Sequence, residues 1–270
     1  MPLSLSRLAP LALSLALMTG GAQAGPPVMQ PGSVELPAKT GERHRQVLTV
    51  TNPGGEDHAL TVGLANWTLD RDGRLRLAPP GDNDNPVLDW VRFTPAYLSL
   101  PPGESGQIVV DVIAPDNLLR AGDYRFALMA SSVAPDAQTG RMEKTELSSL
   151  FYVTVAPAVS DAVVSDVRLQ RSGGTPPHLE LDLTNSGNAH ARLEGKILIE
   201  GHAGEPVILP VSNLVVLEGQ QRRFSIPVKT ELPEEPRVTV RLDDIFAPQT
   251  ETGVAPIREY SAPLDGAPLN

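Results

Sequence analysis

The sequence predicts an all-β protein made of two immunoglobulin-like β-sandwich domains in tandem. Between Val91 and Val112, two runs of alternating apolar residues flank a Pro-Pro-Gly-Glu-Ser turn, which indicates antiparallel strands with one buried face. The 27 prolines and 23 glycines fit a loop-rich β protein better than a helical one. Further short alternating runs follow one another at the spacing typical of such sandwiches.

The first domain is expected to comprise residues 25–156. Its opening segment, residues 25–32, is rich in Gly and Pro and is expected to be flexible. Trp67 lies in a predicted strand, and we expect aliphatic side chains to cover it because the chain has no cysteine pair. The predicted strands are residues 34–36, 46–51, 59–69, 74–78, 92–100, 107–113, 123–132 and 147–155.

The second domain is expected to comprise residues 157–270, after a short hinge at residues 155–158. Pro157 lacks the N–H that a strand needs and so favours the end of the preceding strand here. A last strand is expected near residues 257–260 in a Pro-rich tail, and residues 116–120 form at most one helical turn. The remaining predicted strands are residues 162–170, 178–184, 192–200, 207–211, 222–227 and 237–243.

The first 24 residues have the features of a signal peptide. Arg7 is their only charge, an apolar run follows it, and Ala22-Gln23-Ala24 is a small-residue cleavage site. Cleavage after Ala24 predicts a periplasmic protein, and no second long apolar run predicts membrane insertion. The net charge of −10 argues against nucleic acid as a partner, and the absence of cysteine excludes disulfides and thiolate chemistry.

The sequence predicts neither a catalytic site nor a cofactor. Asp70-Arg71-Asp72-Gly73 begins like a calcium loop, but the position that should supply a bidentate Glu is Gly81, so a hairpin turn is the better interpretation. Asp82-Asn83-Asp84-Asn85 could hold a hard cation, although a solvated loop is favoured. No two histidines stand at metal-ligand spacing; they are His44, His58, His178, His190 and His202. We therefore predict no metal site and no enzyme.

The run at residues 147–155 is the candidate binding element, because its β propensity is strong and it carries no charge. If it lies at a sheet edge, its backbone can pair with an incoming strand. A paired interior strand is an equally good interpretation. Arg43, Arg141 and Lys144 are candidate anchors for a partner's carboxylate. The residues predicted to pair with the partner strand are Leu147, Ser149, Leu150, Phe151 and Val153.

Four segments resemble the periplasmic pilus-assembly chaperones (PapD-like). They are the Trp strand and turn at residues 65–73, the strand–turn–strand unit from Val91 to Val112, the Leu150-Phe151-Tyr152 run, and the turn from Asn185 to His190. The resemblance implies a non-enzymatic chaperone of two immunoglobulin-like domains. Its implied partners are a secreted, β-rich, pilin-like subunit, which it holds by strand addition, and an outer-membrane usher.

The chain departs from that family at the residues that bind the subunit's carboxylate. The family's Lys position falls at Ser149 and its Arg position near Val34, and only Met142 is a large apolar residue within residues 140–145. Two alternatives therefore stay open. The chain is a structural or adhesive module with the same fold, or, less favoured, a metal-dependent enzyme or sensor. Self-association through free edges is a further expectation.

Overall fold

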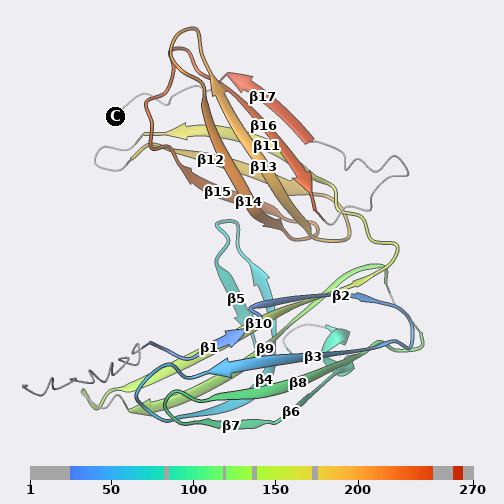
Figure 1. Ribbon diagram of the computed structural model, residues 1–270. Helices are drawn as coiled ribbons and strands as arrows, with labels where there is room; N and C mark the ends of the chain where they lie inside the picture. Colours follow the sequence, from blue (N-terminus) through green and yellow to red (C-terminus); the bar gives the residue numbers. More distant parts are fainter. Residues whose placement is uncertain are drawn as a thin grey trace, which may run out of the picture.

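The protein is two β-sandwiches joined by one short linker (Figure 1). The computed structural model describes residues 25–81, 85–117, 120–135, 139–171, 176–245 and 258–263. Every strand pair joins strands of the same sandwich, and residues 156–161 connect the two. The predicted fold class is confirmed. The predicted signal peptide, residues 1–24, lies outside the described residues.

Two sheets face each other in the first sandwich. One has the order β1 (Val28–Gln30), β3 (Arg43–Thr51), β8 (Ser105–Ile113) and β6 (Val91–Thr94). The other has the order β2 (Ser33–Ala38), β10 (Met142–Val155), β9 (Gly122–Pro135), β4 (His58–Leu69) and β5 (Leu75–Ala78), and β7 (Tyr97–Leu100) also pairs with β4. Alternate residues of both sheets face inward, and the stacked rings of Phe126 and Phe151, 4.4 Å apart, lie in this core.

Three local predictions for this domain were wrong. The single strand expected at residues 92–100 is divided at Pro95, so that β6 pairs with β8 while β7 pairs with β4 in the other sheet. Pro95 has no N–H for a continuous ladder. Within the segment expected to be flexible, β1 pairs with β3 because alternation buries Met29. A short 3-10 helix, η1 (Pro86–Trp90), was not predicted, and none of the described helices is long and apolar enough to cross a membrane.

The second sandwich follows the predicted strands closely. One sheet has the order β11 (Ala162–Gln170), β12 (His178–Asn185) and β15 (Gln221–Pro227). The other has the order β14 (Val207–Val216), β13 (Ala191–Glu200), β16 (Arg237–Asp244) and β17 (Arg258–Pro263). Leu, Ile and Val side chains from both sheets form its core. The last strand, expected near residues 257–260, begins at Arg258.

A third apolar cluster lies between the two sandwiches. Trp67 and Tyr152, whose rings meet edge to face with centroids 5.0 Å apart, pack in it against Val215 and Leu217 of the second domain. Aliphatic side chains surround Trp67 as expected, but Val215 and Leu217 come from the second domain. Alternation shows that one face of a strand is buried but cannot show whether a sandwich core or a domain interface buries it.

Candidate functional site: an open strand edge beside the domain interface

β10 is paired along its whole length on one side and along only half of it on the other. It pairs with β9 from Met142 to Val155 in an unbroken antiparallel register. On its other side, β2 pairs with it only from Leu150 to Val155. Among the described strands, none pairs with that side of residues 142–148. We call this stretch the open edge.

The direction of the backbone groups along the open edge follows from one hydrogen bond. The N–H of Leu150 donates to the carbonyl of Gly32, at 3.0 Å, on the β2 side of β10. Because backbone groups alternate in direction along a strand, Lys144, Glu146 and Ser148 also direct their N–H and C=O groups to this side. The open edge therefore presents a row of donors and acceptors that a partner strand can pair with.

The structure divides the residues predicted to pair with a partner. Leu150, Phe151 and Val153 pair with both β2 and β9, so an incoming strand could add there only by displacing β2. Leu147 belongs to the open edge, where its half-buried side chain packs on the first core. Ser149 ends the edge: its buried hydroxyl donates to the carbonyl of Pro31, at 2.8 Å.

The three candidate anchors do not form one site. Lys144 lies on the open edge with its ammonium 2.7 Å from Glu146, and its side chain is exposed. Arg141 lies just before β10 and is exposed. Arg43 lies on β3, in the opposite sheet, where its guanidinium forms a salt bridge to Asp111. Only Lys144 and Arg141 are therefore placed to contact a strand at the open edge.

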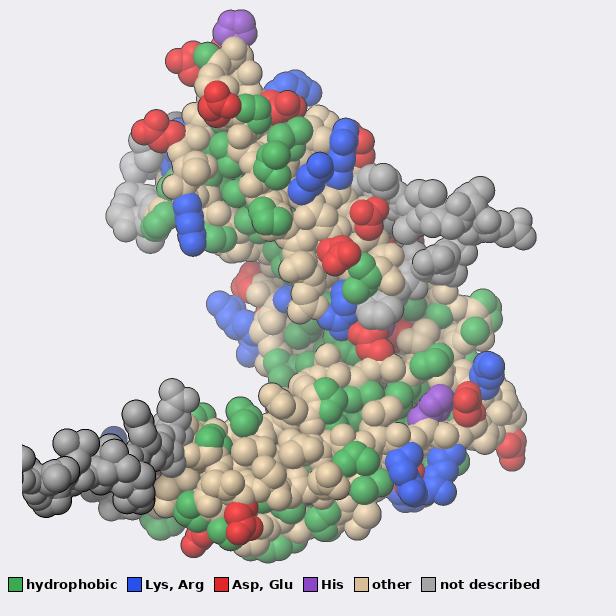
Figure 2. Space-filling view, viewed as in Figure 1, with side chains coloured by type: hydrophobic (Ala, Val, Ile, Leu, Met, Phe, Trp, Pro, Cys, Tyr) green, Lys and Arg blue, Asp and Glu red, His purple; other side chains and the backbone are tan. Residues whose placement is uncertain are grey.

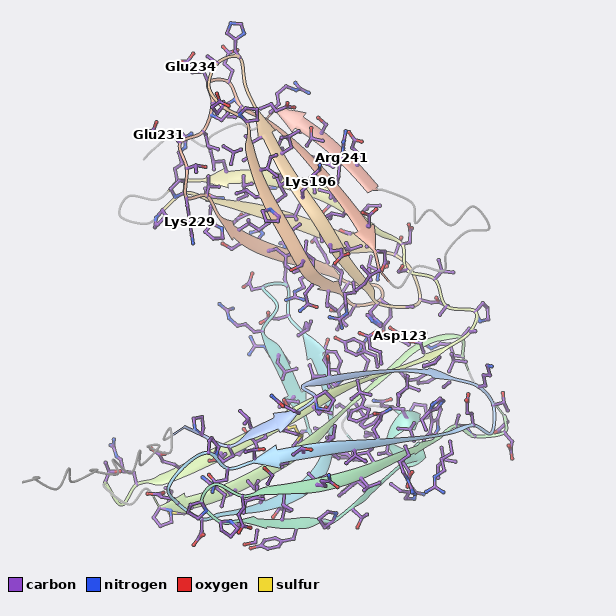
Figure 3. All side chains as sticks on the ribbon, viewed as in Figure 1. Asp123, Lys196, Lys229, Glu231, Glu234 and Arg241 are labelled. Carbon is purple, nitrogen blue, oxygen red and sulfur yellow. The ribbon has the colours of Figure 1, made fainter. Side chains whose placement is uncertain are left out.

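An ionic network between the domains lies next to the paired half of β10. The carboxylate of Asp123, on β9, accepts hydrogen bonds from the backbone N–H and the ring Nδ1 of His190, both at 2.6 Å, and from the Thr154 hydroxyl at 2.7 Å. Figure 3 labels Asp123 at the junction of the domains. Burial opposes protonation of His190, but its hydrogen bond to Asp123 and its ion pair with Glu35 raise its pKa to about 9.

The arginines along the interface are largely engaged with carboxylates. Arg192 forms an ion pair with Glu35, and Arg125 forms one with Glu218. Arg71, at the tip of the β4–β5 hairpin, reaches Asp182 of the second domain at 3.1 Å. Arg222 has no carboxylate partner among the described residues and instead donates to the carbonyl of Val215. These contacts fasten the domains to each other and leave few cationic groups for a ligand.

The sequence suggested parts of this network but not the whole. His190 was noted only as the end of a turn resembling a family motif, and nothing in the sequence marked Glu35 or Asp123, since single carboxylates on strands are common. No local signal could have identified Asp123, because it lies on the face of β9 opposite the core-facing Tyr124 and Phe126 and is buried by the second domain.

The described residues offer no arrangement for metal chemistry. They contain no group of three or more His, Asp or Glu side chains that could hold a metal ion. The oxygen-rich loop Asp82–Asn85 lies outside the described residues except for Asn85, whose amide donates to Asn66 and to the carbonyl of Arg125. The alternative that this loop holds a cation, which was less favoured than a solvated loop, therefore stays untested.

Several solved structures of similar fold are fimbrial chaperones or complexes that contain one. CfaA, the class 5 fimbriae chaperone, is 14% identical, and the match covers 90% of this chain and 100% of that chain with a TM-score of 0.45. A chain of the chaperone–tip adhesin complex of CFA/I fimbriae is 13% identical, with coverages of 90% and 100% and a TM-score of 0.46. A chain of the Salmonella enterica SafA pilin–SafB chaperone complex is 12% identical, with coverages of 87% and 96% and a TM-score of 0.43.

No protein-family model matches the sequence, and no curated protein matches it either. At these identities the likeness to the solved structures is one of fold.

Proposed function

We propose that this protein is a periplasmic chaperone that holds a secreted, β-rich, pilin-like subunit by adding a strand of the subunit to the open edge. The observation that carries the proposal is the one-sided pairing of residues 142–148. An open edge is a hazard for aggregation unless it serves pairing, and it supplies backbone hydrogen bonds to any strand of suitable shape. The resemblance of four sequence segments to pilus-assembly chaperones agrees with it.

Along the open edge, the two faces of β10 to which side chains point differ in polarity. Leu147 packs on the first core, so an added strand would extend the inner face with its own apolar side chains. Lys144 and Glu146 form a salt bridge on the exposed outer face. Charged residues on an edge discourage indiscriminate pairing, so this pair favours a partner strand that is polar on that side. The proposed partner strand is therefore amphipathic, with alternating apolar and polar residues.

A proline at a position whose backbone N–H faces the open side of β10 can abolish partner binding without breaking a hydrogen bond to β9. Glu146→Pro removes a backbone N–H that faces the open side and leaves the hydrogen bonds to β9 intact. Proline at Ser149 would instead remove an N–H that faces β9. We expect tagged wild-type protein from native periplasm to co-purify with one or two small, β-rich secreted subunits in near-equal amount. Glu146→Pro should lose them, and Glu146→Ala, which keeps the N–H, should retain them.

Two controls make the outcome decisive. Circular dichroism and the thermal midpoint should show that Glu146→Pro is folded. Equal capture of the subunit by a folded Glu146→Pro protein would contradict strand addition at this edge.

A structural or adhesive module is the second candidate. It is favoured because the interface between the domains leaves few cationic groups to bind a subunit's carboxylate. The interface between the domains is filled by Trp67, Tyr152, Val215 and Leu217 and is lined by salt-bridged arginines. A chain of that kind would purify from fibre-producing cells without a subunit, whichever residue stands at position 146.

A further inference from the structure

Three arginines surround one carboxylate on the outer face of the first domain. Asp111 on β8 lies directly opposite Arg45 on β3 and Arg92 on β6. Its carboxylate accepts two hydrogen bonds from Arg45, at 2.8 and 3.0 Å, and two from Arg43, at 3.0 and 2.6 Å. We call this surface the arginine face; it comprises Arg43, Arg45, Arg92, Asp111, Val47 and Ile113.

The guanidinium groups of this face still have donors that point to solvent. The side chains of Arg43 and Arg45 are 53% and 59% exposed, whereas that of Asp111 is 13% exposed. Asp111 engages Nε and Nη2 of both arginines, and no hydrogen bond to a described residue uses their Nη1 groups. Arg92 forms no ion pair with the described residues. Asp111 thus orders two cationic groups without covering them.

The composition of this sheet is that of a protein interface. Its strands β1, β3, β8 and β6 carry Arg43, Arg45, Arg92 and Asp111 but no Lys and no Glu, within a chain of net charge −10. Val47 and Ile113 are exposed by 46% and 42%. Arginine is enriched and lysine depleted where proteins meet. Figure 2 shows Lys or Arg side chains gathered on the part of the first domain that β3, β8 and β6 occupy in Figure 1.

We propose that the arginine face docks an acidic segment of a partner protein, in extended conformation, in which carboxylates alternate with apolar residues. Arg43 and Arg45 stand two residues apart on one strand, with their Cα atoms about 7 Å apart, which is the spacing of every second residue in an extended segment. Their guanidinium groups converge on Asp111. Carboxylates suit the forked guanidinium donors, and the apolar residues of the segment would cover Val47 and Ile113.

The small number of cationic groups on the arginine face favours a peptide over a membrane or nucleic acid as its partner. Binding to a lipid surface or to nucleic acid relies on many cations, each contributing about 1 kcal/mol at an anionic membrane. This face has three arginines, one of its charges is offset by Asp111, and the remainder of the chain is acidic. A short acidic peptide segment needs only two or three such contacts. The proposal is independent of the open edge, which belongs to the opposite sheet.

The probe is an eight-residue peptide with blocked ends in which Glu alternates with Val. It is titrated to millimolar concentration against the full mature chain, and NMR follows the chemical shifts of the backbone amides. We expect saturable shifts on β3, β8 and β6. A peptide with Gln in place of Glu should bind at least tenfold more weakly. Arg92→Gln and the double variant Arg43→Lys/Arg45→Lys, which keeps the charge but removes the fork, should each weaken binding severalfold.

Two control variants test whether binding is specific to the arginine face. Arg168→Gln removes an exposed, Asp-paired arginine from the second domain and should bind the peptide as the wild type does. Glu146→Pro should also bind it normally, which separates this proposal from strand addition. The proposal is overturned if millimolar Glu peptide gives no saturable shift, if the Gln peptide binds equally well, or if the arginine variants bind unchanged. Tighter binding to phosphatidylglycerol vesicles than to the peptide would overturn it as well.

Discussion

His190 shows at the scale of one residue how the two domains are held together. It lies on the second domain, yet its ring hydrogen-bonds Asp123 of the first and stands 3.6 Å from Glu35. Its ring also packs on Tyr152, with centroids 4.3 Å apart. These contacts with two carboxylates stabilise the interface only while His190 is protonated, so their contribution depends on pH.

The direction of that dependence follows from the raised pKa. His190 titrates near pH 9 in the folded protein and near 6.5 when unfolded, so its contribution to stability is complete below pH 6.5 and is lost as the pH rises toward 9. The shift corresponds to about 3 kcal/mol. We expect His190→Gln to be less stable than the wild type by about that amount at pH 6.5, and the difference to shrink by pH 9. Urea unfolding at both values measures it, and parallel pH profiles would refute the assignment.

At the scale of elements, the β4–β5 hairpin is a further connection between the domains, besides the linker and the ion pairs of the interface. In Figure 1 it rises from the first domain toward the second. At its tip the carbonyl of Arg71 accepts a hydrogen bond from the N–H of Arg223, at 2.7 Å. Gly73, with a φ of 81°, approaches Arg222 so closely that a Cβ would lie 2.3 Å from its Nη2. The hairpin and the linker together should hold the domains at one angle.

Gly73→Val tests that role. The side chain would be strained at this φ and would push against Arg222, so the hairpin tip should leave the second domain and the two domains should tumble independently. Gly103→Val is the control, since Gly103 has a φ of 75° but a Cβ there would meet no described atom within 4 Å. Nitrogen-15 relaxation should give different correlation times for the two domains in Gly73→Val only. Equal correlation times in Gly73→Val would show that the linker and the buried interface suffice.

The sequence predicts the elements well because strand alternation is a local property. Thus β11 begins and ends where it was expected. What it could not predict is non-local: that β6 and β7 join different sheets, that Trp67 faces the second domain, and that β2 covers only half of β10. The run at residues 147–155 has the same alternating pattern whether one side of the strand is free or paired. The sequence therefore suggested an edge at residues 147–155, whereas the unpaired stretch is residues 142–148.

At the scale of the whole molecule, the protein is two domains in direct contact, with the open edge of β10 beside their interface. The hairpin, the salt bridges and the apolar cluster together hold the two domains in contact, and no described strand other than β9 pairs with residues 142–148. A chaperone of this design would present the same edge to each subunit, with β2 continuing the pairing beyond it.

The most direct measurement of this claim is amide hydrogen exchange along β10, in the free chain and in the complex with a captured subunit. The amides of Lys144, Glu146 and Ser148 face the open side and should exchange rapidly in the free chain. They should become protected in the complex, whereas those of Thr145 and Leu147, which already face β9, should change little. Unchanged exchange at Lys144, Glu146 and Ser148 in a stable complex would contradict strand addition at the open edge.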